Sequence, residues 1–527
     1  MSKLILLPPE LIVAVLERLD ASSLLACRAL CRLLRQIIDE TSSLVYTIEL
    51  EIAGQDDASC QLFAVEKLEK LQNHQAAWNS LQWTKDAEFP MIDGSLWELF
   101  GNVLAQRSNE GQFLFRQLPS MLRDIPEKEW SITPDEPRKV RDFGMDPAQD
   151  LLILVAPPRR GNLNHKIYCK TMSKGTKHPL VSHSGIIEKV NLFHTSYSVS
   201  IQISGDFLSL LYHDHAQNEL FVWNWKTGHL ELDLTGLAIK SSCFMSERHL
   251  VLSVLKTEVQ AILSLFIVDF LKESNERKAY TEAQHQYTLC YPTLNRDTHP
   301  IHFTIRSDPS PGWVPNQNLG VPFYTSPNNK IFVACLCAIG PEGRHFLFLV
   351  IPQKTLLAHQ NAMDSENKEV EWNIWGEDTR LLDLCPTTMG FVTWECYVYG
   401  SKFVITEANF DDEEDFEVNS STLLVYDFNQ YTLKRALAQG ASSMSESDIT
   451  SVPVSSQDPL HCITSATTLS LDVFNDEVTT GLPYRLGCIP FEPSRAPYAV
   501  MCSEDSLIAV DVRTPHNINR AFRVYTF

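Results

Sequence analysis

The residues best suited to metal chemistry form a short group after an apolar run. His213, Asp214 and His215 follow the run that ends at Tyr212, and two imidazoles beside a carboxylate are ligands that zinc or iron accept. Histidines two residues apart around an acid in a turn usually face solvent, so we interpret the group as a surface turn. The acids from Asp411 to Asp415 lack the glycine and spaced ligands of a calcium loop, and we interpret them as a solvated charge run. The sequence therefore predicts no metal site.

The chain also lacks the short motifs that bind phosphates or activate a nucleophile. Glycine is sparse, at 21 of 527 residues, and neither GxGxxG nor GxxxxGKS/T occurs. The sequence contains no GxSxG nucleophile elbow and no HExxH zinc pair. We therefore expect neither a catalytic residue nor a cofactor in this chain.

The thirteen cysteines are expected to be free thiols. Their number is odd and no CxxC pair repeats, which is typical of a protein of the cytosol or nucleus. Cys27 and Cys31 stand at helical spacing, and Cys335 and Cys337 alternate along an apolar run. Because no second pair completes a tetrahedral site, small buried hydrophobic residues explain both pairs better than a metal does.

The balance of charge argues against polyanions as partners. The chain has 44 Lys and Arg against 65 Asp and Glu, a net charge of −21, and no basic block offsets it. Nucleic acid and anionic membranes need clustered cations, so we expect neither to bind. The apolar run from Val259 to Val268 is interrupted and too short to span a bilayer. Pro8, Pro9 and Glu10 interrupt the N-terminal apolar run, and we predict no secretory signal.

Two helical segments are predicted to position the N-terminal residues. From Leu7 to Val45 apolar residues recur at intervals of three and four, which predicts a unit of about three short helices over residues 4–45. Pro8 and Pro9 suit a first helical turn, and the segment from Asp20 to Ser23 supplies a break with an N-cap. The same periodicity predicts a connecting helix over residues 59–83.

From residue 93 to residue 527 short apolar or alternating runs are separated by turn residues, which predicts mostly antiparallel strands. Three phrases share one form, an apolar run followed by Asn or Asp and an aromatic residue: Leu220–Trp225, Leu265–Phe270 and Leu423–Phe428. Asn224 and Asp269 lie 45 residues apart, within the period of four-stranded propeller blades. Trp225-Lys-Thr-Gly228 resembles the end of the third strand of a WD-type blade. The predicted fold is an α+β multidomain chain with a helical head, a connecting helix and a β-propeller of six to eight irregular blades, with seven as the central value.

Long loops must interrupt this propeller. Division of its 435 residues by the blade period gives nine or ten blades, more than a closed ring usually holds. Residues 407–417 contain seven acids and no base, and residues 441–456 contain seven serines. We interpret both segments as solvated loops, and phosphorylation of the serines would extend an already negative surface.

A Leu-Pro opening at Leu7–Leu11 and a Cys31-Arg32 phrase bracket the N-terminal unit. In both features and in their separation the unit closely resembles an F-box, the module that grips the Skp-family adaptor of cullin-RING ubiquitin ligases. Leu33 and Leu34 stand where the family commonly places Trp or Phe, so these positions offer less apolar area. The resemblance implies that the adaptor-binding residues are Leu7, Pro8, Leu11, Val15, Leu16, Leu19, Leu24, Leu25, Cys31, Leu34 and Ile37.

The size of the unit points in the same direction. A domain this small buries too little surface to be comfortably stable alone, and its apolar residues are too many for one internal seam. An external helical partner or the connecting helix must cover the remainder. A helical cap that only closes the propeller is the alternative interpretation.

Four further phrases extend the resemblance: Trp97-Glu98-Leu99, Asp146–Leu152, Trp225–Gly228 and Leu482–Arg485. Their order looks like that of the large class of F-box proteins found in mushroom-forming fungi. Few members of that class have assigned substrates, so this resemblance implies a role without a target.

The resemblance implies the substrate-recognition subunit of an SCF-type (Skp-cullin-F-box) ubiquitin ligase in the cytoplasm or nucleus. The head would bind the Skp-family adaptor and, through it, the cullin-RING ligase, and the propeller would bind an unknown target protein. Two alternatives are an adaptor-bound scaffold or regulator that ubiquitylates nothing, and a propeller hydrolase or lyase with an incidental helical cap. The acidity of the propeller region favours basic or neutral protein partners. Candidate aromatic anchors, of which at least half are expected in blade cores, are Trp223, Trp225, Trp372, Trp375, Trp394, Tyr397 and Tyr399.

Overall fold

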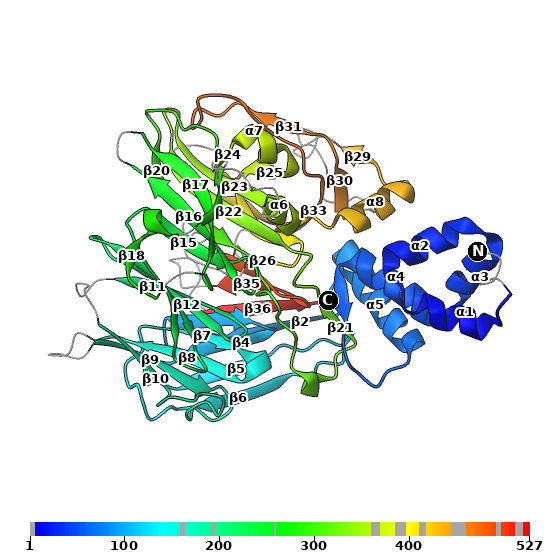
Figure 1. Cartoon of the computed structure of the whole chain (residues 1–527), viewed down its shortest axis with the longest axis horizontal. Helices are drawn as coiled ribbons and strands as arrows, with labels where there is room; N and C mark the ends of the chain where they lie inside the picture. Colours follow the sequence, from blue (N-terminus) through cyan, green and yellow to red (C-terminus); the bar gives the residue numbers. More distant parts are fainter. Residues whose placement is uncertain are drawn as a thin grey trace.

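The computed structural model describes residues 6–158, 164–190, 197–257, 260–272, 275–283, 285–359, 369–384, 397–410, 418–444, 460–491, 497–511 and 520–527. A helical head stands beside a larger β-sheet body, and the N-terminal end of the head lies farthest from the sheets (Figure 1). The acids at 411–415, Trp394 and the serines of residues 445–456 lie outside the described residues.

Four helices build the head in the described part of the chain: α1 (Pro9–Leu16), α2 (Ala21–Leu30), α3 (Arg32–Glu40) and α4 (Ser42–Ala53). Pro9 is the first residue of α1, where a missing N–H costs no hydrogen bond. Asp20 caps α2, because its carboxylate accepts a hydrogen bond from the Ser23 N–H at 2.7 Å. The predicted proline start and N-cap are both present.

Helix α4 carries the head beyond residue 45, where the sequence predicts that it ends. Its residues alternate apolar with polar types over part of its length, a pattern that favours a strand. The segment is nevertheless helical, because Leu44 and Ile48, one helical turn apart, both pack into the head core. Gly54 ends the helix at φ +68°, a left-handed conformation that suits glycine.

Two elements connect the head to the sheets. The connecting helix is α5 (Ala64–Ser80), shorter at each end than the predicted 59–83. Ahead of it, β1 (Gln55–Asp57) pairs antiparallel with β21 (Phe323–Thr325), which belongs to the long segment between two strands of the propeller. Backbone hydrogen bonds therefore join the head to the sheet body.

Seven sheets form the blades of a propeller in the described residues. Blades one to three contain β3 (Leu96–Phe100), β4 (Val103–Arg107), β5 (Phe113–Gln117) and β6 (Lys128–Ile132); β7 (Asp142–Asp146), β8 (Leu151–Ala156), β9 (Asn164–Thr171) and β10 (Ile186–Val190); and β11 (Ser198–Ser204), β12 (Phe207–His213), β13 (Asn218–Asn224) and β14 (Leu230–Thr235). Blades four and five contain β15 (Ile239–Phe244), β16 (His249–Lys256), β17 (Ile262–Asp269) and β19 (His285–Cys290); and β20 (His299–Arg306), β22 (Ile331–Ile339), β23 (Arg344–Pro352) and β25 (Arg380–Asp383). Blade six contains β26 (Val398–Tyr399), β27 (Lys402–Phe410), β28 (Val418–Asp427), β33 (Tyr484–Phe491), β30 (Leu460–Ile463) and β29 (Ser443–Met444). The first strands of blades one to five line a common cavity at the centre of the ring.

Blade seven closes the ring with a strand from the N-terminal side. It combines β34 (Ala499–Cys502), β35 (Ser506–Asp511) and β36 (Ala521–Thr526) with β2 (Lys85–Pro90), which pairs with β36 along its whole length. The propeller thus begins before residue 93, where the sequence predicts its start. Strand β2 is charged, largely exposed and ends in proline, so it gives little strand signal in the sequence.

The predicted fold and blade number are confirmed, and the extra length lies in insertions. The three repeated phrases fall on β13, β17 and β28, each the third strand of its blade, and Trp225, Phe270 and Phe428 are buried. Segments beyond the four-stranded blades include α6 (Gln353–Ala358), α7 (Trp372–Trp375), α8 (Gln430–Ala438), β18 (Lys278–Ala279), β24 (Glu369–Val370), β31 (Thr467–Leu469) and β32 (Val478–Thr480). Within the described ranges, every helix is too short or too polar to cross a bilayer.

Candidate docking face of the head and its junction with the propeller

The structure divides the predicted adaptor-binding residues into two groups. Leu7, Leu11, Val15 and Leu25 are 39%, 53%, 44% and 44% exposed, and Pro8 is exposed beside them in the chain. The second group comprises Leu16, Leu24, Leu34 and Ile37, which are buried in the head core, and Leu19 and Cys31, which are partly buried and pack against it. The exposed residues are available to a partner, whereas the buried residues hold the helices together.

Two further leucines enlarge the exposed apolar surface of the head. Leu30 and Leu33 are 54% and 40% exposed, although neither belongs to the predicted contact set. Helical periodicity places Leu11 and Val15 on one face of α1, one turn apart. We call the exposed set Leu7, Leu11, Val15, Leu25, Leu30 and Leu33 the apolar face. Singly exposed apolar side chains are ordinary, but these five leucines and one valine in a head this small indicate a contact surface.

Polar contacts keep the helices that carry this face in a fixed arrangement. Arg28 on α2 makes a two-pronged contact with Asp39 on α3, Nε to Oδ1 at 2.6 Å and Nη2 to Oδ2 at 3.2 Å. These hydrogen bonds hold the pKa of Asp39 below its usual value. The Ser43 hydroxyl donates to Glu17 Oε1 at 2.7 Å and ties α4 to the residue after α1.

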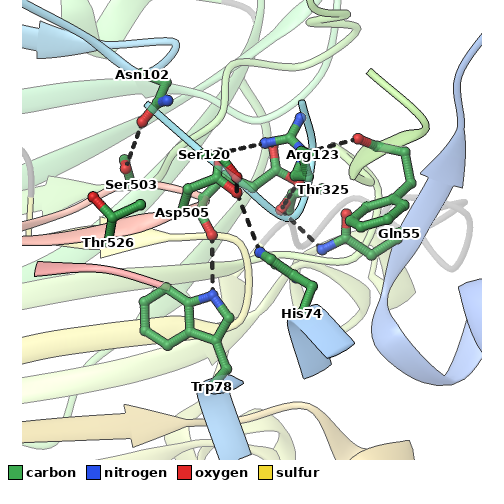
Figure 2. A network of polar contacts seen from close by, with 12 residues as sticks. Gln55, His74, Trp78, Asn102, Ser120, Arg123, Thr325, Ser503, Asp505 and Thr526 are labelled. Atoms are coloured by element: carbon green, nitrogen blue, oxygen red, sulfur yellow. Dashed lines mark hydrogen bonds and ion pairs between the residues drawn. The ribbon is translucent and has the colours of Figure 1, made fainter. Parts of the chain in front are cut away.

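Helix α5 inserts two side chains into the propeller end nearest the head (Figure 2). Trp78 donates from Nε1 to the Glu504 carbonyl at 3.1 Å and stacks on Phe527 with ring centroids 4.0 Å apart. Lys402 Nζ lies 4.7 Å from the Trp78 ring. His74, 1% exposed, places Nε2 3.3 Å from Asp505 Oδ1. The connecting helix is therefore part of the propeller core as well as a link to the head.

A buried ion cluster surrounds His74. Arg123, from the β5–β6 connection, donates from Nη1 to Asp505 Oδ2 at 2.7 Å and lies 3.1 Å from Glu504 Oε2. Its Nε donates to the Phe323 carbonyl at 3.1 Å. Ser120 donates to Asp505 Oδ1 at 3.1 Å. Blade one, blade seven and the β20–β22 segment thus converge on one guanidinium, and α5 joins the cluster through His74, as Figure 2 shows.

Burial and the single cation set the protonation of this cluster. Burial, opposed by Arg123 and aided by the charge of Asp505, raises the pKa of Glu504 to about 7. Burial also acts to raise the pKa of Asp505, but Arg123 and the hydrogen bond to His74 hold it below its usual value. Burial lowers the pKa of His74. One cation therefore faces one ionised carboxylate and a second that titrates near neutrality.

Glu504→Gln is expected to change how stability depends on pH. The folded protein keeps a proton on Glu504 that the unfolded chain releases above about pH 4.5, so this group lowers the free energy of unfolding as the pH rises from about 4.5 to 7. Glutamine has no proton to lose, so the variant should gain stability relative to the wild type across that interval. Urea denaturation at a series of pH values measures the difference, with the exposed Glu129→Gln as control. A difference that stays constant with pH would contradict the raised pKa.

A second group of contacts fixes the other side of the head. Arg435 on α8 makes two hydrogen bonds with Glu49 on α4, at 2.6 and 2.9 Å. Tyr46 donates its hydroxyl to the Pro322 carbonyl at 3.0 Å, and Asn429 Nδ2 donates to the Ile52 carbonyl at 2.9 Å. With the β1–β21 pairing, these contacts hold the head in one orientation on the propeller.

The other residues singled out in the sequence, where the structure describes them, do not gather into a metal-binding group. His213 is partly buried, and burial together with Arg306 and Lys240 lowers its pKa to about 4, whereas His215 is exposed. The group of possible metal ligands that converges among the described residues is Cys290, Glu369 and Glu371, which includes neither His213 nor His215. Cys27, Cys31, Cys335 and Cys337 are free thiols, as expected. The candidate anchors Trp223, Trp225, Trp375, Tyr397 and Tyr399 are buried, and Trp372 packs against a blade core.

The sequence did not predict the residues that join the head to the propeller. Arg123, Glu504 and Asp505 lie in short turns between strands, where single charges are common, and 382 residues separate Arg123 from Asp505. His74 and Trp78, four residues apart on one face of the predicted connecting helix, were the available signal for a buried contact.

A comparison with known protein families gives a match in the head of the chain. Residues 4–51 match the family model described as F-box-like. Among curated proteins, no match is found. The chain is similar to the crystal structure of Chaetomium thermophilum Sqt1 bound to the N-terminus of the ribosomal protein L10, at 12% sequence identity and a TM-score of 0.25. The match covers 48% of this chain and 56% of that one, so this chain spans little more than half the length of that structure. It is also similar to the tail fiber of Staphylococcus aureus phage P68, at 10% identity and a TM-score of 0.20 over 75% of this chain and 87% of that one. The chain consists of an F-box-like domain followed by a seven-bladed β-propeller, an architecture typical of non-catalytic adaptor or receptor proteins.

Proposed function

We propose that this chain is the substrate-recognition subunit of an SCF-type ubiquitin ligase. The apolar face of the F-box-like head binds a Skp-family adaptor, the adaptor brings the cullin-RING ligase, and the propeller binds a target protein. The observation that carries the proposal is the exposure of Leu7, Leu11, Val15 and Leu25 on a domain that matches the F-box-like family. As part of this proposal, the chain acts in the cytoplasm or nucleus. We also propose that it is a member of the large class of F-box proteins found in mushroom-forming fungi.

The fixed junction supports this role. In such a ligase the target reacts because it is held near a conjugating enzyme bound elsewhere in the complex, so chemistry depends on proximity. A receptor with a loose head would spread its target over many positions. The ion cluster around Arg123, the Trp78 stack and the Arg435–Glu49 pair together restrict the head to one position.

Reconstitution tests the proposed role. The full chain, purified adaptor and cullin-RING complex are expected to co-elute in size-exclusion chromatography, whereas a Leu11→Asp, Leu25→Asp chain elutes alone. Separate elution of the wild-type chain would contradict the proposal.

A scaffold that binds the adaptor without ubiquitylation is the second reading of the same head. It predicts co-elution with the adaptor but no increase in the abundance of any interacting protein when the chain is removed or the proteasome is inhibited. A receptor predicts an increase in the abundance of its target under both conditions.

A further inference from the structure

A groove lies at the end of the propeller that faces the head, between blade one, blade two and the segment from β20 to β22. Its cavity volume is about 600 Å³. Apolar and proline side chains supply much of its wall: Pro126, Trp130, Pro147, Met172, Trp313 and Pro315. A groove of this size admits a peptide segment or a drug-sized molecule.

The wall is fixed before anything binds. Trp130 donates from Nε1 to the Met172 carbonyl at 3.1 Å and stacks on Phe115 with centroids 5.2 Å apart. Trp313 donates from Nε1 to Asp146 Oδ1 at 3.2 Å. Because both indole N–H groups are satisfied within the protein, the rings are held in place and offer apolar surface to the groove. A preformed wall lowers the entropic cost of binding.

The polar groups of the wall are mostly used internally. The carboxylate of Asp150 accepts from the Ser173 N–H at 2.7 Å and from the Ser173 hydroxyl at 2.6 Å. Gln117 Nε2 donates to the Pro126 carbonyl at 2.7 Å. The groove therefore favours apolar contacts and backbone hydrogen bonds over recognition of a strongly charged ligand.

A strand edge borders the groove and provides backbone partners. Strand β6, which contributes Lys128 and Trp130 to the wall, is the last strand of blade one in the described part of the chain. Two other blades show what such an edge accepts. A fifth strand of the same chain pairs in parallel with the outer strand of each, β18 with β14 and β24 with β19. Addition of one more extended segment is thus a contact that this propeller already makes twice.

We propose that the groove binds an extended peptide segment of the target protein, with an aliphatic or proline side chain between Trp130 and Trp313 and its backbone along β6. As a target site, this inference rests on the proposed receptor function. The segments that build the groove also build the junction: the β5–β6 connection supplies Arg123 and Pro126, and the β20–β22 segment supplies Trp313 and Phe323. A target bound here would therefore lie beside the junction between propeller and head.

A random peptide library displayed on phage and panned against the full chain tests this site. The enriched peptide, synthesised with a fluorophore, is titrated by fluorescence polarisation against the wild type and three variants. Leu319→Arg places a long cation in the groove wall and should weaken binding about tenfold or more. Leu237→Arg, a half-exposed leucine outside the groove, is the matched control and should leave the affinity unchanged. Trp130→Ala, checked for folding by its thermal transition, should weaken binding in the same way.

Several results would overturn the inference. These are a library that yields no enriched sequence, a peptide that binds Leu319→Arg as tightly as the wild type, and a wild-type dimer that Leu319→Arg converts to a monomer, since a second copy would then occupy the groove. Leu319→Arg should bind the adaptor normally. A wild-type chain that binds the peptide but does not bind the adaptor would instead count against the proposed function.

Discussion

Arg123→Met is expected to destabilise the protein by about 3–5 kcal/mol, the largest single effect that the structure predicts. Arg123 is 2% exposed and is the cation that Glu504 and Asp505 share. Methionine fills similar volume but leaves Asp505 buried without its charged partner, and the Phe323 carbonyl loses its donor. Because the cluster joins blade one, blade seven and α5, the loss should appear as a lower urea midpoint together with faster proteolysis of the head.

Arg28→Met is the matched control for this prediction. Arg28 makes a two-pronged pair with Asp39, but both side chains are 43% exposed, and solvent screens such a pair strongly. The control should therefore lose only a small fraction of the stability that Arg123→Met loses. Equal losses in the two variants would show that the buried cluster does not hold the junction together.

Leu11→Asp combined with Leu25→Asp is expected to weaken adaptor binding by about a thousandfold or more while the thermal transition stays in place. Both leucines lie on the apolar face, so a charge at either position is hydrated in the free protein and desolvated only when a partner covers it. Loss of two anchors at about 2 kcal/mol each gives this magnitude.

Two comparisons separate binding from folding in that experiment. Val65→Asp changes an apolar side chain that is 59% exposed on α5, outside the F-box-like residues, and should leave adaptor binding unchanged. Leu16→Asp buries a charge in the head core, where Leu16 is 1% exposed, and should unfold the head. If the double variant melts like Leu16→Asp, the apolar face is part of the core and the interpretation of the head is wrong.

Local sequence signals predicted much of the fold. Three signals depend only on neighbouring residues, and the structure places each as expected. The Leu-Pro opening lies at a helix start, Asp20 caps the next helix, and the three repeated phrases lie on the third strands of their blades. The phrase spacing alone gave nine or ten blades, and allowance for inserted loops gave the prediction of six to eight with seven as the central value, which matches the seven sheets. Strand β2 escaped prediction because its partner, β36, lies more than 400 residues away and supplies its stability.

The candidate site was predictable only in part, because burial depends on packing. Leu11 and Leu16 are alike in the sequence, but contacts with the other head helices bury one and leave the other exposed. The junction depends on Arg123, His74 and Asp505, which come from three distant parts of the chain. The groove likewise brings together Trp130 and Trp313, which lie far apart in the sequence, so no local spacing could predict it.

The affinity of the full chain for a purified Skp-family adaptor is the most direct test of the account. Isothermal titration calorimetry is predicted to show one adaptor bound per chain, with a negative heat-capacity change from burial of the apolar face, and no binding to the Leu11→Asp, Leu25→Asp chain. A flat titration of the wild-type chain, or equal affinities for the two chains, would contradict the assignment of the head as the adaptor-docking domain.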